Sequence, residues 1–243
     1  MSDPSTYVPP WIRYMQDDTG TWGLLIYRCA SYHNPERWAR YRAALDRIWD
    51  ASWEYWWRSY QHIGVTEEMY EMVKSRMELV WVEGEEMQGW GVDEVRSAFT
   101  RLRDAMPSSE EEPRLAQDPW NLDLPIPYHK DRNSALLVDE ACVSSLLGPE
   151  DGEVPLPETE TKSAVRKRGR EGYVVAVDAR YRPGLGYVSG KAPVPYSGWA
   201  KIGTGVIFTE LVHRRVYVNS LVPLDTIYSQ AFEREISGGV WWG

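Results

Sequence analysis

Hydrophobic and polar positions follow two different patterns along this chain. Short apolar runs bounded by turn or charged residues are typical of buried β-strands. They occupy residues 22–28, 78–83, 135–139 and 173–180. From residue 35 to about 60, apolar residues instead recur at steps of three and four, which predicts one face of a long helix. The same spacing predicts a further helix within residues 89–106, and the segment 140–147 is predicted to be helical.

Strands that alternate with helices predict a single α+β domain over residues 1–243, built on a central sheet. We expect a ferredoxin-like sheet of about four or more strands with helices mainly on one face. The alternative is a mixed doubly wound sheet. Two segments lack periodicity: 107–130 is predicted to be an irregular crossing loop, and 149–171 a mobile charged loop.

The aromatic content adds an ambiguity about the long helix. The chain has 13 Trp but only 3 Phe, and several of the Trp residues lie on the apolar face of the helix predicted from residue 35. Aromatic side chains mostly build cores, but a row of them can also form a groove for flat or cationic ligands, or a docking face for a partner. The sequence leaves these interpretations open.

Charge and cysteine usage narrow the class of protein. A net charge of -9 disfavours binding to a long nucleic-acid backbone, so no DNA partner is expected. Cys29 and Cys142 match neither a disulfide framework nor a zinc spacing, and each is interpreted as a small buried residue. No apolar stretch has the length or flanks of a secretory signal or a membrane span, so we expect a cytoplasmic location.

Familiar signatures of chemistry do not occur in the sequence. It contains no dinucleotide fingerprint, P-loop, hydrolase elbow or zinc-protease motif, and its 4 His have no helical ligand spacing. No cofactor or metal is therefore expected. The stretch 201–205 contains two glycines before a predicted helix and could hold an anion on backbone N–H groups, although a flexible helix cap is the alternative. The candidate substrate-binding residues are Arg28, Trp199 and Lys201.

Charged residues gather at the predicted strand ends, where sheets commonly present ligands. If the strand order brings these ends together, they could serve acid–base chemistry or clamp a cationic amine or guanidine. The alternative is that they cap helices or face solvent. The candidate catalytic residues are Tyr27, Glu83, Asp139 and Asp178.

One concentrated run of positive charge lies between residues 162 and 170. In a mobile loop this run could meet the phosphates of an RNA substrate, or it could simply pair with the acidic stretch before it. The candidate RNA-binding residues are Lys162, Arg166, Lys167, Arg168 and Arg170.

Three short motifs carry a resemblance to known proteins. Residues 22–28 (WGLLIYR), 136–140 (LLVDE) and 198–201 (GWAK) resemble a large group of filamentous-fungal proteins of unassigned function. In size the chain is also similar to the arginine-containing cyclodipeptide synthases of fungi, although no motif of theirs is matched. That resemblance implies a cofactor-independent cytosolic enzyme of specialised metabolism.

Such an enzyme transfers acyl groups from aminoacyl-tRNA and needs an acidic pocket for an arginine side chain. The candidate carboxylates would then orient an amine or guanidine, and Tyr27 would relay a proton. The alternative function is a non-catalytic interaction module that docks a partner on the Trp-rich helix face.

Overall fold

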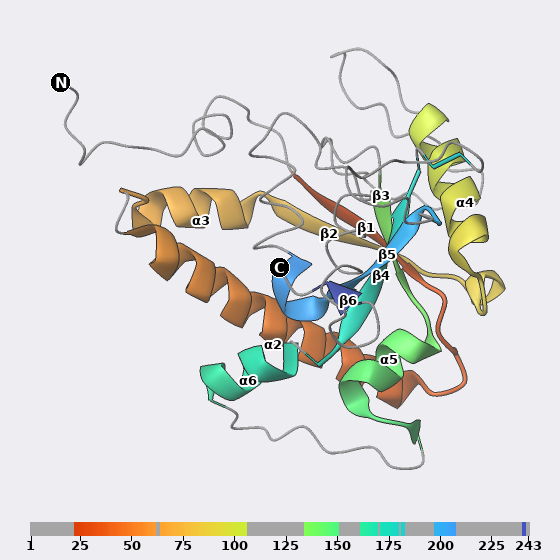
Figure 1. The fold of residues 1–243 in the computed structure, drawn as a ribbon, viewed down its shortest axis with the longest axis horizontal. Coiled ribbons are helices and arrows are strands. Elements are labelled where there is room, and N and C mark those ends of the chain that lie inside the picture. The colour runs from red at the N-terminus through yellow and green to blue at the C-terminus, as the bar shows by residue number, and fades with distance from the viewer. Residues whose placement is uncertain are drawn as a thin grey trace, which may run out of the picture.

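The chain folds around one mixed β-sheet, as seen in a computed structural model (Figure 1). The structure describes residues 22–61, 64–105, 134–150, 161–169, 171–179, 181–182, 197–207 and 240–241. The strands are β1 (Trp22–Arg28), β2 (Met77–Val82), β3 (Ser134–Val138), β4 (Tyr173–Asp178), β5 (Trp199–Gly203) and the short β6 (Val240–Trp241). They lie in the order β2-β1-β3-β4-β5-β6, which confirms an α+β protein with a single sheet.

The strand pairing differs from the ferredoxin-like arrangement expected from the sequence. In that arrangement the two strands of each βαβ unit are split by another strand. Here β1 and β2, which are joined through two helices, pair directly and in parallel. β3 pairs in parallel with the other side of β1, and β4 then runs antiparallel to β3 and β5. The observed sheet is therefore closer to the mixed, open alternative.

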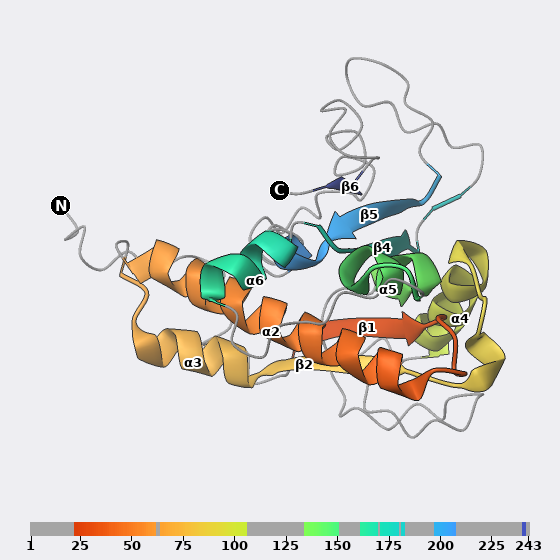
Figure 2. The same cartoon turned by 90° about the horizontal axis from the view of Figure 1, so that it is seen from below.

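The helices form two layers. α2 (Pro35–Tyr60), α5 (Glu140–Leu147) and α6 (Lys162–Gly169) lie on one side of the sheet, where α5 and α6 each contact α2, and α3 (Glu67–Ser75) lies beside one end of α2 (Figures 1 and 2). α4 (Val92–Ala105) packs against β3 and β4 from the other side (Figure 1). The short 3-10 helices η3 (Glu85–Met87) and η5 (Thr204–Val206) complete the described elements.

Three of the described tryptophans of α2 belong to the core. The helix begins where the Asn34 side chain accepts a hydrogen bond from the backbone N–H of Arg37 at 2.9 Å, with a proline at the first helical position. Trp38, Trp49 and Trp53 are only 8%, 3% and 3% exposed, respectively. Since these side chains fill the interior, they do not offer a surface on which a partner could dock.

Helix α6 corrects part of the sequence interpretation. Residues 162–169 were expected within a charged loop, but they form a helix that packs on α2 and buries Val165. The remainder of the segment around 151–160 and the predicted crossing loop 107–130 lie outside the described residues. Among the helices that the structure describes, none combines the length and apolar character needed to cross a membrane.

Candidate functional site

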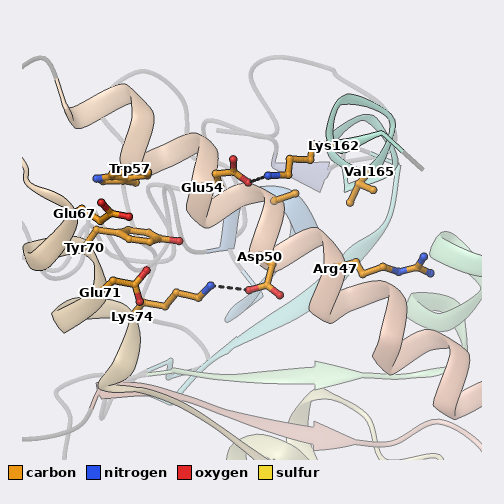
Figure 3. Close-up of a pocket in the computed structure, with 11 residues that line it drawn as sticks. Arg47, Asp50, Glu54, Trp57, Glu67, Tyr70, Glu71, Lys74, Lys162 and Val165 are labelled. Carbon is orange, nitrogen blue, oxygen red and sulfur yellow. Dashed lines mark hydrogen bonds and ion pairs between the residues drawn. The ribbon is translucent and has the colours of Figure 1, made fainter. Parts of the chain in front are cut away.

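A groove with a volume of about 480 Å³ lies between α2, α3 and α6 (Figure 3). Its walls combine carboxylates, amines and aromatic rings with the apolar side chains of Ala51 and Val165. Its volume falls in the range of roughly 300–1,000 Å³ that is common for small-molecule sites. The groove is therefore a candidate binding site for a small molecule.

Aromatic packing fixes one wall of the groove. α3 begins where the Thr66 hydroxyl accepts a hydrogen bond from the backbone N–H of Met69 at 3.3 Å. From α3, the ring of Tyr70 stacks on Trp57 with 5.0 Å between ring centroids, and it meets Trp53 edge-on at 6.3 Å. Because these contacts hold α3 against α2, the Trp57 and Tyr70 rings line the groove as a fixed pair.

Ion pairs occupy the middle of the groove. The ammonium of Lys74 lies 3.0 Å from a carboxylate oxygen of Asp50, which joins α3 to α2. Lys162 of α6 pairs in the same way with Glu54 of α2 (Figure 3). Glu54 also pairs with Arg58, at 2.6 Å. These contacts neutralise both lysines of the groove within the protein.

Two further carboxylates line the α3 side of the groove. Glu67 and Glu71 are exposed and lie beside Tyr70, and neither has an ion-pair partner among the described residues (Figure 3). Residues four apart on a helix have Cβ atoms about 5–6 Å apart, so both can contact the same small ligand. Arg47, the remaining charged residue of the groove, lies at its opposite end (Figure 3). The end formed by α3 is therefore locally acidic.

The titration of the groove follows from its contacts. Burial alone would lower the pKa of Lys74, but its hydrogen bond and attraction to Asp50 outweigh burial, and the pKa is raised overall. Burial raises the pKa of Tyr70, partly opposed by the nearby charge of Lys74. Both groups therefore hold their protons at neutral pH.

This arrangement suits an organic cation. An ammonium or guanidinium can approach Glu67 and Glu71 while its carbon chain lies against the rings of Trp57 and Tyr70. A further aromatic ring does not fit between those two rings, because they already stack on each other. An aliphatic amine or guanidine is the best match for these walls.

Some of the residues singled out from the sequence do meet, but at a different place. Arg28, Glu83 and Asp139 lie at the ends of β1, β2 and β3, and these parallel strands end at the same edge of the sheet, here called the carboxyl edge. Glu83 accepts a hydrogen bond from the indole N–H of Trp38 at 3.0 Å. Asp139 accepts one from the backbone N–H of Cys142 at 2.8 Å and thereby caps α5. The alternative role of Asp139 as a helix cap is the one observed.

Other predicted site residues are separated from this edge. Asp178 pairs with Ser134 at the beginning of β3, which places it at the opposite edge of the sheet. Tyr27 is 2% exposed and, because side chains alternate along a strand, faces the other side of the sheet from Arg28. The predicted catalytic set therefore does not form one site.

The candidate residues on β5 are also apart from the carboxylates. Trp199 pairs with Val177, the neighbour of Asp178, and so lies near the edge of the sheet opposite the carboxyl edge. The ammonium of Lys201 lies 4.7 Å from the ring centroid of Tyr173. In the glycine-containing stretch, the N–H of Thr204 donates to the carbonyl oxygen of Gly172 at 2.9 Å. The backbone N–H of Thr204 is therefore not available to bind an anion.

Of the predicted RNA-binding residues, Lys162 lines the groove and Lys167 is exposed on α6. The side chains of Arg166 and Arg168, and residue Arg170, lie outside the described part of the chain.

Most of the groove was missed by the sequence reasoning. The short helix α3 carries Glu67, Tyr70 and Glu71, which line a groove only because α2 and α6 pack beside it. Asp50 and Glu54 belong to the polar side of α2. The available signal was the pair of glutamates four residues apart that flanks a tyrosine, which is too common to single out a site.

Within the described residues, no group of three or more His, Cys, Asp or Glu side chains is placed to hold a metal ion. No protein-family model matches this sequence, and neither does any curated protein or solved structure. The chemical argument therefore rests on the groove itself.

Proposed function

We propose that this chain binds an aliphatic amine or guanidine in the groove between α2, α3 and α6, and acts on it as an enzyme. The observation that carries the proposal is the pair of carboxylates, Glu67 and Glu71, beside the stacked rings of Trp57 and Tyr70. The two lysines of the groove are already paired with Asp50 and Glu54, so they leave the α3 carboxylates available to a ligand cation.

The reaction that fits this substrate best is acyl transfer to an amine. The amine nitrogen forms an amide bond with the carbonyl carbon of an aminoacyl ester, and the bond between that carbon and the ester oxygen breaks. A substrate that binds as an ammonium first releases one proton to water. Glu67 or Glu71 then accepts the proton that the nitrogen loses as the amide bond forms, and passes it to the oxygen of the departing alkoxide, which leaves as a hydroxyl group.

The proposed acyl donor is an aminoacyl-tRNA, in keeping with the resemblance to cyclodipeptide synthases. Support comes from the position of α6, because this helix carries basic residues of the run 162–170 and also lines the groove. A donor held by this helix would have its acyl end near the amine.

Expression in a bacterial host tests the reaction, since such a host supplies arginyl-tRNA. We expect a new arginine-containing amide or diketopiperazine in the culture extract relative to an empty-vector strain, detected by untargeted mass spectrometry. The double variant Glu67→Gln/Glu71→Gln should abolish it, whereas Glu68→Gln should not, because Glu68 is exposed on the same helix but does not line the groove. An unchanged profile in the wild-type strain would contradict the acyl-transfer proposal.

A further inference from the structure

A buried arginine that has no counter-ion among the described residues lies at the carboxyl edge of the sheet, on the side that α2 covers. Arg28 is the last residue of β1 and is 6% exposed. Its guanidinium carbon lies 3.7 Å from the ring centroid of Tyr32 and 4.3 Å from that of Trp38. The side chain is therefore held between two aromatic rings.

The neighbouring carboxylates are committed to other arginines. Glu140 lies 3.6 Å from Nε of Arg37 and also accepts a hydrogen bond from the backbone N–H of Ser31 at 3.2 Å. Glu83 lies 3.5 Å from Nη1 of Arg42 and accepts from the Trp38 indole. Among the described residues, no carboxylate lies within 4.0 Å of the Arg28 guanidinium, which leaves its charge without a direct partner.

The hydrogen-bonding capacity of Arg28 is also incompletely used. Nη2 donates to the carbonyl oxygen of Ser31 at 2.8 Å, but Nε is buried and has no hydrogen-bond partner among the described residues. An arginine carries five N–H donors, and a buried donor or charge that is left without a partner destabilises the folded protein. A bound oxyanion would meet both needs at once.

The surrounding backbone holds this arginine in place. The hydroxyl of Tyr32 donates to the carbonyl oxygen of Arg28 at 3.4 Å and accepts from the backbone N–H of Gly84 at 2.8 Å. These two hydrogen bonds link the loop that follows β1 to the loop that follows β2. A ligand would therefore meet a donor that is already oriented.

We propose that the carboxyl edge is a second binding site, in which Arg28 binds the carboxylate or phosphate group of a small molecule. The planar fork of a guanidinium matches both oxyanions. The site is separate from the groove between α2, α3 and α6, and it does not depend on the function proposed for that groove.

Nuclear magnetic resonance on the wild-type protein tests this site directly. Inorganic phosphate and acetate, each titrated against chloride at constant ionic strength, should shift the Nε–H resonance of Arg28 in a saturable way. A response to phosphate alone would identify a phosphate ligand, and a response to acetate alone a carboxylate ligand. If neither anion moves this resonance, the proposal is wrong.

A pair of variants provides the matched control. Arg28→Gln should weaken the binding of the anion at least about tenfold, because it removes a charged hydrogen-bond donor. Arg103→Gln removes the same charge from α4, where Arg103 pairs with Asp104, and should leave the affinity unchanged. Equal losses in both variants would show a general salt effect and contradict the site. If Arg28→Gln fails to fold, the titration of the wild-type protein still decides.

Discussion

Single residues in this protein often take their behaviour from burial. Cys29 and Cys142 are both buried, and burial raises the pKa of the Cys29 thiol to about 12 and that of Cys142 well above its ordinary value. The negative charge of Asp139 adds to both shifts. Since the thiolate is the reactive form, neither cysteine is suited to be a nucleophile. The structure thus confirms the interpretation of both residues as small buried side chains.

We predict that neither cysteine reacts with iodoacetamide in the folded protein at pH 8, whereas both react in urea, as measured by intact mass. The same shifts give a pH dependence of stability. Because the folded state holds these thiol protons more tightly, the free energy of unfolding should fall as pH rises above about 8.5, the ordinary thiol pKa. Alkylation at equal rates in folded and unfolded protein would contradict this account.

At the scale of elements, the residues at which helices begin are the easiest features to predict. The junction between β3 and α5 is an example. The sequence 135–147 was predicted to be a strand leading into a helix, and β3 and α5 confirm it. The side chain of Asp139 between them accepts the hydrogen bond of a helix cap. A carboxylate at a strand end is therefore explained here by helix formation, without catalysis.

The capping role predicts a specific contrast between two substitutions. Asp139→Ala should lower the free energy of unfolding by about 1 kcal/mol, because it removes the acceptor for the Cys142 N–H. Asp139→Asn should have little effect, since asparagine caps helices as well as aspartate does. Urea denaturation measures both. If the asparagine variant lost as much stability as the alanine variant, the charge rather than the cap would be the important feature.

For the whole molecule, the sequence indicated the elements better than their arrangement. The strand 22–28 and the helix from residue 35 were predicted with nearly the observed bounds, because apolar periodicity and an Asn-Pro helix start are local signals. The strand order was not predicted, because direct pairing of β1 with β2 depends on contacts between distant segments. Gly23 belongs to this contact: a Cβ there would overlap the carbonyl oxygen of Glu78.

The groove escaped prediction for the same reason. α6 has a strongly polar sequence that predicts a loop, yet Val165 is buried where the helix packs on α2, and Lys162 lines the groove. α2 and α3 are neighbours in the chain, but α6 comes much later, so the groove that Glu67 and Glu71 line becomes visible only when α6 is packed beside the other two helices.

The claim that this groove binds an organic cation is tested most directly by calorimetry with a matched pair of ligands. N-butylguanidine carries a positive charge, whereas N-butylurea has nearly the same shape and is neutral. We expect the wild-type protein to bind the guanidine and not the urea. The double variant Glu67→Gln/Glu71→Gln should bind the guanidine at least about tenfold more weakly, while Glu68→Gln should bind it as the wild type does. Equal binding of both ligands, or equal affinities in the two variants, would contradict the account.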